Sequence, residues 1–446
     1  DAGAYNLSLT TKALNRIIEQ SKQHHEKSIC FVTGVPGAGK TLVGLNIANE
    51  RHQYDEQEHA VFLSGNGPLV AVLREALARD EIKRFKGKIT KTASKRKVAA
   101  FIQNIHHFRD AYLPPSEQVP AEKVAIFDEA QRAWTKEQTA KFMLKRHVPG
   151  WNMSEPEFLI SVMDRHQDWT VIICLIGGGQ EIHTGEAGLL AWFDALRDHF
   201  PDWNVYVSPQ ISDVEYTHGK PLEHLFTGLR LYREPNLHLS VSLRSFRNER
   251  VSAFVKSLLD ENLPVAQQLY SELSPNYPIT ITRSLEKAQE WIRAQARGTE
   301  RYGLIASSGA KRLRQFGIWV QSNIQAENWF LNDKEDIRSS YFLEDTATEF
   351  DIQGLEIDWA IVAWDADYRI EKGHFKAYNF TGSSWKTVCK KDAQLYLKNT
   401  YRVLLTRARQ GFVIFIPEGC DADLTRQSSF YDGIYYYLKK IGMKEL

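Results

Sequence analysis

The sequence has few cysteines, and none of them has the spacing that binds a metal. The four cysteines (Cys30, Cys174, Cys389 and Cys420) are scattered, without a C-x-x-C pair. This pattern argues against a zinc site and fits a reducing cytoplasm. No apolar run approaches the roughly 20 residues of a membrane span, and no signal peptide is visible, so we predict no membrane association. We therefore expect an intracellular protein, cytoplasmic or nuclear.

The chain also has almost no net charge. A value of +1 does not indicate nucleic-acid binding through the overall charge, so any such binding must come from local patches. The 446 residues, of which 43% are hydrophobic and 25% charged, are ordinary for a globular chain of about two to four domains. Because the chain begins at Asp1 rather than Met, we expect a fragment of a longer protein, with room for an additional N-terminal nuclease or sensor domain.

The stretch 30–41, CFVTGVPGAGKT, matches the phosphate-loop pattern G-x-x-x-x-G-K-[ST]. It lies between an apolar strand predicted at 28–33 and a helix predicted at 42–50. Loop N–H groups and the helix N-terminus would surround a phosphate. Lys40 would reach the β- and γ-phosphates, and the Thr41 hydroxyl would hold Mg²⁺. The sequence therefore predicts ATP and Mg²⁺ as ligands, with the nucleotide bound by Gly34, Pro36, Gly37, Ala38, Gly39, Lys40 and Thr41.

Polar residues follow two other predicted strands. Asp128 and Glu129 come directly after a buried strand at 123–127. Asp128 is positioned to hold Mg²⁺ through water, and Glu129 to polarise the attacking water. Gln180 follows three glycines after the strand at 170–176, where an amide can contact both water and the γ-phosphate; the alternative is a simple tight turn.

Two arginines in the second half are candidates for transition-state stabilisation. Arg244 follows a strand predicted at 237–241, and Arg407 lies in a helix predicted at 394–409. A guanidinium can take up the charge that develops during phosphoryl transfer. The alternative for both residues is an ordinary surface arginine.

The segment 83–97 is rich in lysine and arginine and contains no acidic residue. A helix at 98–109 is predicted to follow it. Such a run is either a solvated face or a segment that contacts nucleic-acid phosphates. The residues predicted to contact nucleic acid are Lys83, Lys88, Lys91, Lys95 and Arg96.

Strands alternate with helices twice along the chain, which predicts an α/β fold with parallel sheets. We place the first domain at 1–207, a linker at 208–235 and the second domain at 236–446. The phosphate loop belongs to the first domain, and Arg244 and Arg407 belong to the second.

The motifs occur in the order GVPGAGKT, DEAQ, GGGQ, SLRS, TEFDIQGLEID and YRVLLTRAR. This order resembles a superfamily 1 helicase core, and more closely the helicase-like domain of Schlafen proteins and its bacterial relatives. The resemblance covers about residues 27–417. It implies two tandem RecA-like P-loop NTPase domains flanked by helices, with ATP in the cleft between them. By the same resemblance, Gly354 and Glu356 couple the nucleotide to nucleic acid, with Glu356 near the ribose, and Arg244 and Arg407 reach across the cleft.

These features favour an ATP-dependent helicase or translocase acting on nucleic acid, either DNA or RNA. One alternative is a nucleotide-gated P-loop switch that signals to another domain. A second alternative is a nucleic-acid-binding Schlafen-like module with little turnover. In relatives, such arrangements suggest a role in antiviral defence.

Overall fold

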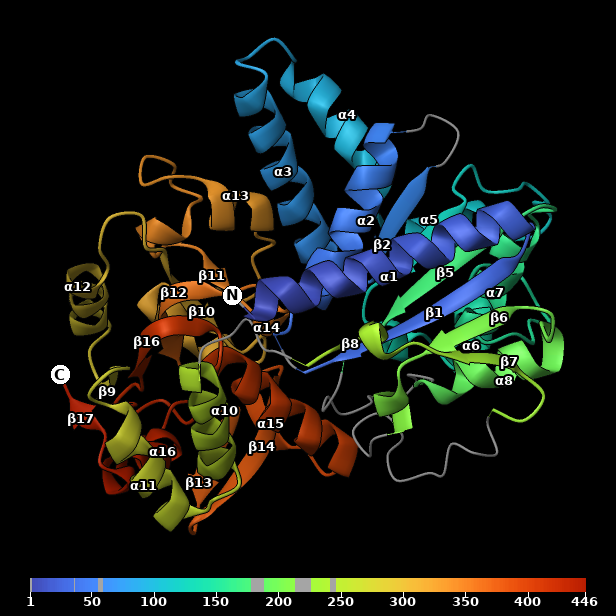
Figure 1. Cartoon of the computed structure of the whole chain (residues 1–446). Coiled ribbons are helices and arrows are strands. Elements are labelled where there is room, and N and C mark those ends of the chain that lie inside the picture. Colours follow the sequence, from blue (N-terminus) through green and yellow to red (C-terminus); the bar gives the residue numbers. More distant parts are fainter. Residues whose placement is uncertain (1, 36, 55–58, 178–187, 213–225, 241–245) are drawn as a thin grey trace. The chain divides into compact units, whose positions relative to one another are not determined.

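The computed structural model describes residues 2–35, 37–54, 59–177, 188–212, 226–240 and 246–446. The chain divides into two compact units (Figure 1). Unit 1 comprises residues 1–70 and 77–244, and unit 2 comprises residues 71–76 and 245–446. Within the described ranges, no helix combines the length and apolar character needed to cross a membrane.

Unit 1 is built on a parallel sheet with the strand order β3-β2-β4-β5-β1-β6-β7, in which β8 also pairs with β1. Strands β2, β4 and β5 are buried along their whole length, as expected for parallel strands covered on both faces. The strands are β1 (Lys27–Gly34), β2 (Ala60–Ser64), β3 (Ile102–Asn104), β4 (Val124–Phe127), β5 (Thr170–Leu175), β6 (Asn204–Val207), β7 (Arg230–Arg233) and β8 (His238–Leu239).

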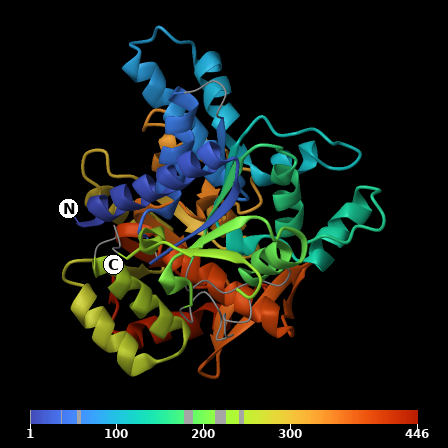
Figure 2. The ribbon, with the colours of Figure 1, turned by 45° about the vertical axis from the view of Figure 1, so that its right-hand side comes forward.

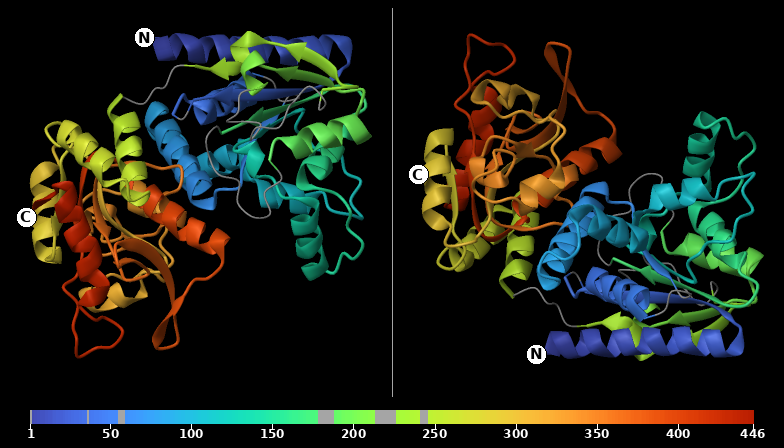
Figure 3. Two further views of the ribbon diagram at one scale, coloured as in Figure 1. Left: turned by 90° about the horizontal axis from the view of Figure 1, so that it is seen from below. Right: turned by 90° about the horizontal axis from the view of Figure 1, so that it is seen from above.

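Helices cover both faces of this sheet (Figures 1 and 3). Helices α1 and α2 lie on one face, and α7 and α8 pack on the other. The helices up to residue 240 are α1 (Ala2–His24), α2 (Lys40–Tyr54), α3 (Gly67–Arg84), α4 (Lys91–Phe101), α5 (Ile105–Ala111), α6 (Lys136–Lys145), α7 (Glu155–Asp164) and α8 (Leu190–His199), with short 3-10 turns η1 (Ala130–Arg132), η2 (Pro209–Ser212) and η3 (Pro235–Leu237).

Gly44 lets α2 lie close to the sheet. A Cβ atom at this position would come 2.9 Å from Leu175 Cδ1 and 3.0 Å from Ile126 Cγ2. The helix that follows the phosphate loop is therefore held against β4 and β5, the strands that end at the other candidate residues.

The predicted helix at 98–109 is wrong, because the chain breaks it with a short strand. Helix α4 ends at Phe101, β3 pairs with β2, and α5 begins at Ile105. Asn104 ends the strand and caps α5, since its side chain accepts a hydrogen bond from the His106 N–H. The hydrogen bonds of β3 to the edge strand β2, together with the N-cap at Asn104, replace the helical hydrogen bonds that a continuous helix would form here. Ser154 caps α7 in the same way, because its side chain accepts a hydrogen bond from the Glu157 N–H.

The division between the units falls later in the chain than the predicted linker at 208–235. Strand β7 lies inside that segment and pairs with β6, with Tyr206 and Tyr232 stacked at 5.0 Å. Strand β8, which was assigned to the second domain, pairs with β1. The strand predicted at 237–241 is therefore present as β8, but its partner lies far away in the sequence, so its place in unit 1 was not predicted. Strand β7 was not predicted.

Unit 2 contains a second parallel sheet, with the order β11-β10-β12-β16-β9-β17, and a separate antiparallel sheet, β13-β14-β15. The antiparallel sheet was not predicted. The strands are β9 (Ile279–Thr282), β10 (Tyr302–Ala306), β11 (Thr346–Ala347), β12 (Ile357–Ala363), β13 (Tyr368–Glu371), β14 (His374–Thr381), β15 (Ser384–Thr387), β16 (Ala408–Phe415) and β17 (Lys444–Glu445).

Two apolar clusters cover the faces of the unit 2 sheet. One contains residues from α10, α11, α15 and α16, and the other contains residues from α12. Helices α10 and α11 lie side by side (Figures 1 and 2). The helices are α10 (Phe246–Leu259), α11 (Leu263–Leu273), α12 (Leu285–Gln295), α13 (Ala326–Leu331), α14 (Glu349–Ile352), α15 (Lys391–Leu405) and α16 (Ser429–Ile441), with 3-10 turns η4 (Lys311–Phe316) and η5 (Ser340–Phe342).

The predicted helix at 394–409 extends too far. Helix α15 ends at Leu405, and Arg407 lies between this helix and β16. The Arg407 carbonyl accepts a hydrogen bond from Ile357 N at 3.2 Å, so strand pairing begins here and stops the helix. The predicted fold class, an α/β chain of two tandem RecA-like domains with parallel sheets flanked by helices, is confirmed.

Candidate nucleotide-binding site

The phosphate loop joins the buried end of β1 to the first residue of α2. Gly37 and Gly39 have positive φ angles of 75° and 91°, which favour glycine. Ala38 is buried, and its N–H donates to the Val35 carbonyl at 3.1 Å. The loop is thus a closed turn whose conformation depends on its two glycines. Pro36 lies outside the described residues.

Lys40 folds back onto the loop that precedes it. Its Nζ donates to the Gly34 carbonyl at 2.7 Å and to the Val35 carbonyl at 3.3 Å. These bonds hold the ammonium at the loop, where a phosphate would be bound.

Thr41 and Asp128 meet at the end of the sheet. The Thr41 Oγ1 donates to Asp128 Oδ1 at 3.2 Å, which links the first turn of α2 to the end of β4. Hydroxyl and carboxylate oxygens are the hard ligands that Mg²⁺ prefers, so this pair fits the ion. Among the residues that the structure describes, no group of three or more His, Cys, Asp or Glu side chains could hold a metal. Mg²⁺ commonly keeps several waters and binds through one or two protein groups together with substrate phosphates, which this pair would allow.

The environment of Asp128 raises the pKa of its carboxyl group. Its exposed fraction is 8%. Burial, followed by the neighbouring Glu129 charge, raises the pKa of Asp128 to about 7, against the opposing effect of the Thr41 hydrogen bond and Lys40. A cation bound at this carboxylate would reverse the effect, because the cation stabilises the ionised form.

Glu129 is held in place by a residue that sequence reasoning did not single out. Gln131 donates from Nε2 to Glu129 Oε2, and its Oε1 accepts from the Gly177 N–H at 2.9 Å. Glu129 itself has a left-handed backbone, with φ 49° and ψ 46°. Gln131 therefore ties the carboxylate after β4 to the end of β5. The signal was present in the DEAQ motif, as an amide two residues beyond the second acid.

Gly177 leaves just enough room for this contact. A Cβ atom at this position would lie 2.6 Å from Glu129 Oε2 and 2.7 Å from Gln131 Nε2. Gln180 follows in the same segment but lies outside the described residues.

A second unpredicted contact supports the phosphate loop from β8. The Val35 N–H donates to the Leu239 carbonyl at 3.0 Å, and a Cβ at Gly34 would lie 2.8 Å from Leu239 Cβ. Helix α1 forms hydrogen bonds to the residues on either side of β8. Asn6 Oδ1 accepts from the Ser240 N–H, and Thr10 Oγ1 donates to the Asn236 carbonyl.

In unit 2, the predicted residues cluster where β12 and β16 begin. Gly354 has a φ of 77°, and the following Glu356 forms an ion pair with Arg409 at 3.1 Å. The half-buried Arg407 donates from Nε to the Val403 carbonyl at 3.2 Å. Arg244 lies outside the described residues.

The basic segment forms the outer end of the α3–α4 helix pair (Figure 1). Lys86 and Gly87 turn the chain there with φ angles of 51° and 75°, next to Phe85, which is half exposed. Two neighbouring basic residues form ion pairs, Arg84 with Asp80 and Lys97 with Glu81. The residues predicted to contact nucleic acid are all exposed: Lys83, Lys88, Lys91, Lys95 and Arg96.

A phosphate loop after β1 of a parallel sheet, with an acidic pair at the end of β4, is the arrangement of the RecA-like P-loop fold. Residues 27–418 match the family described as Schlafen group 3, DNA/RNA helicase domain. The chain belongs to this family, which confirms the resemblance deduced from the motif order. Helix α1 precedes the matched region.

Other comparisons give only distant likenesses. No curated protein matches the chain. A crystal structure of the DUF1998 helicase MrfA bound to DNA and AMPPNP is 12% identical, with a TM-score of 0.32, over 95% of this chain and 50% of that one. The Hef helicase domain of Pyrococcus furiosus is 11% identical, with a TM-score of 0.29, over 95% of this chain and 97% of that one. The chain thus spans about half the length of MrfA.

Proposed function

We propose that this chain is an ATP-dependent helicase or translocase that acts on nucleic acid. The observation that carries the proposal is the Thr41–Asp128 hydrogen bond, because it joins the phosphate loop to the acidic strand end at the point where Mg²⁺ would bind. Membership of a DNA/RNA helicase domain family supports the choice of substrate class.

The residues of the loop would bind the triphosphate, with Lys40 moving from the Gly34 carbonyl to the β- and γ-phosphates. Mg²⁺, held through Thr41 and Asp128, would neutralise phosphate charge. Glu129, oriented by Gln131, would accept a proton from the attacking water. By the family resemblance, Arg407 would stabilise the charge that develops on the γ-phosphate.

The test is ATP turnover by the whole chain, with and without single- and double-stranded DNA and RNA. We expect nucleic acid to stimulate turnover. Lys40→Ala should abolish productive ATP binding, whereas Glu129→Gln should bind ATP without hydrolysing it. Lys136→Ala, at an exposed position at the start of α6, is the matched control and should retain activity. Full turnover by either site variant would refute the assignment. Turnover that nucleic acid does not stimulate would favour the nucleotide-gated switch.

A second measurement tests the nucleic-acid surface. Replacing Lys88, Lys91 and Lys95 by Gln should weaken binding to all sequences alike. The slope of log affinity against log salt should shrink by about 0.7–0.9 for each phosphate contact that is lost. The control is the same replacement at the exposed α6 lysines Lys136, Lys141 and Lys145. Equal effects of the two triple variants would show that the α3–α4 end is an ordinary solvated surface.

A further inference from the structure

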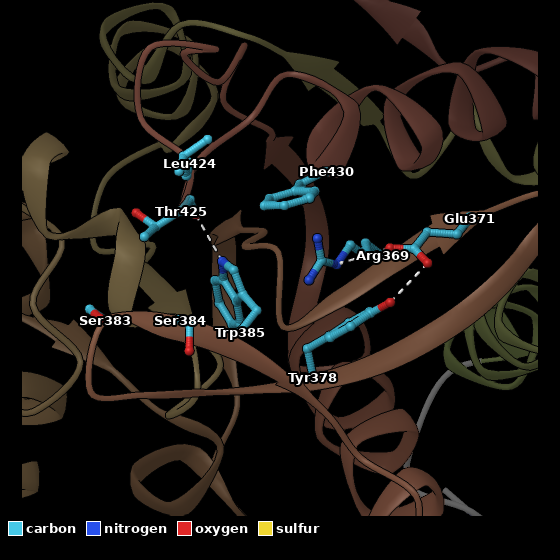
Figure 4. Close-up of a pocket in the computed structure, with 9 residues that line it drawn as sticks. All are labelled: Arg369, Glu371, Tyr378, Ser383, Ser384, Trp385, Leu424, Thr425 and Phe430. Atoms are coloured by element: carbon cyan, nitrogen blue, oxygen red, sulfur yellow. Dashed lines mark hydrogen bonds and ion pairs between the residues drawn. The ribbon is translucent and has the colours of Figure 1, made fainter.

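Unit 2 contains a pocket of about 430 Å³ over one face of the antiparallel sheet β13-β14-β15 (Figure 4). This volume lies within the range of small-molecule sites. The strand register places Arg369 and Glu371 of β13 on the same face as Tyr378 of β14 and Trp385 of β15. The remaining lining residues are Phe430, from the start of α16, the loop residues Leu424 and Thr425, and Ser383 and Ser384 beside β15.

Arg369 is buried in this wall, with an exposed side-chain fraction of 2%. Its guanidinium carbon lies 3.6 Å from the centre of the Tyr378 ring and 3.8 Å from that of Phe430. Figure 4 shows Phe430 on one side of the guanidinium and Tyr378 on the other. Because rings cover both faces, a ligand can reach only the edge of the group, where its N–H donors lie.

The edge of the Arg369 guanidinium is not hydrogen-bonded within the described part of the chain. Its Nε has no hydrogen-bond partner there, and no hydrogen bond joins its terminal nitrogens to another described residue. Glu371 Oε1 is 3.5 Å from Nε, at the outer limit of a hydrogen bond. Figure 4 shows the terminal nitrogens pointing into the space between Trp385 and Phe430. A buried cation with unused donors is costly unless a ligand or water satisfies it.

Two other stacked arginines in unit 2 provide a comparison. Arg283 lies over Tyr435 at 4.0 Å and donates to the Pro417 carbonyl and to Asp432. Arg301 lies over Tyr341 at 4.4 Å, and its terminal nitrogens donate to the carbonyls of Trp329 and Asn332. Both have partners along the edge of the guanidinium, so their stacking is structural. Arg369 has the stacking without those partners.

We propose that this pocket binds a small ligand bearing an oxyanion, a carboxylate or phosphate, carried on an apolar or aromatic body. The planar fork of a guanidinium matches two oxygens of such a group. The body would pack against Trp385, Phe430 and Leu424; Leu424 is 77% exposed. All residues that line this pocket belong to unit 2, whereas the phosphate loop belongs to unit 1.

The test uses calorimetric titration of the whole chain with benzoate, phenyl phosphate and phenol, a neutral molecule with the same aromatic ring and no oxyanion. The Lys40→Ala background prevents phenyl phosphate from reporting on the phosphate loop. We expect both anions to bind at least about tenfold more tightly than phenol, since charge-assisted bonds are the strong ones. The preference between the two anions identifies which oxyanion the site takes. Phenol binding as tightly as the anions would overturn the proposal.

Variants make the test specific to the Arg369 edge. Arg369→Lys keeps the charge but loses the fork, and should weaken anion binding about tenfold or more. Arg301→Lys, at a stacked arginine outside the pocket, is the matched control and should leave anion affinity unchanged.

Glu371→Gln keeps an acceptor for the Tyr378 hydroxyl, which donates to Glu371 Oε2 at 2.8 Å, but removes a negative charge beside the guanidinium. Anion affinity should therefore rise, by about three- to tenfold at this partly exposed position. A gain in anion affinity cannot arise from misfolding, so Glu371→Gln tests the proposed site even if Arg369→Lys does not fold. Unchanged or weaker binding by a folded Glu371→Gln protein would refute the site.

Discussion

Gly177→Ala tests whether the position of Glu129 matters for turnover. The added methyl carbon would lie 2.6 Å from Glu129 Oε2 and 2.7 Å from Gln131 Nε2. Both atoms are side-chain ends, so the backbone can stay while the Glu129–Gln131 pair moves away. The loss of two hydrogen bonds predicts a fall in unfolding free energy of about 2 kcal/mol. Displacing a catalytic group by about 1 Å can cost about 10²-fold in rate. Lys40 and Thr41 are untouched, so ATP affinity should stay within a few-fold.

The assays are urea denaturation, equilibrium ATP binding and single-turnover hydrolysis. The matched control is Gly65→Ala, which also follows a strand end, because a Cβ there would meet Ile105 Cγ2 at an ordinary 3.7 Å. The control should behave like the natural protein in all three assays. Normal hydrolysis by folded Gly177→Ala would show that the Glu129 contact has no catalytic role. A parallel loss of ATP affinity would show general damage to the loop instead.

Three further predictions address unit 2. Arg407→Ala should keep ATP affinity within a few-fold and lose at least about 10² in stimulated turnover. The control Arg293→Ala, on the exposed side of α12, should keep its turnover. Near-normal turnover by Arg407→Ala would contradict a role for Arg407 in the transition state. Burial raises the pKa of Asp367 from 3.8 to about 7, so the stability that this group contributes is full below pH 4, declines as the pH rises and is lost above pH 7. Between pH 5 and 8 this decline is about 3 kcal/mol, and Asp367→Asn should abolish it in urea denaturation at the two pH values. Gly433→Ala would bring a Cβ to 2.1 Å from the Ile370 carbonyl oxygen, so we expect the protein to lose about 1–3 kcal/mol of stability. Helix propensity alone predicts a gain in stability, so a more stable variant would contradict the packing of α16 on β13.

Sequence patterns predicted the elements that carry the nucleotide site, because these elements are signalled locally. The strand β1, the glycines of the loop and the helix α2 form one continuous motif, and Asp128 follows a fully buried strand. The pairing of Thr41 with Asp128 follows from the rule that parallel strands end at one edge of the sheet.

The features that were missed depend on partners far away in the sequence. Strand β8 was expected within the strand at 237–241, but its pairing with β1, at the far end of unit 1 in the sequence, was not. Gln131 was not singled out, since its partner Gly177 follows another strand, β5. Arg369 lay within a stretch that gave no helix or parallel-strand pattern, and its stacking needs Phe430 from α16. Such contacts are set by tertiary packing, which local periodicity does not contain.

The bond between Val35 N–H and the Leu239 carbonyl makes amide exchange a monitor of the phosphate loop. A two-residue strand is a small cooperative unit, so its local opening costs little compared with global unfolding. The Val35 amide should therefore exchange with solvent deuterium much faster than the amides inside β1, although the two are neighbours in sequence. If bound nucleotide tightens β8 against the loop, the protection of this one amide will increase before any change reaches the centre of the sheet.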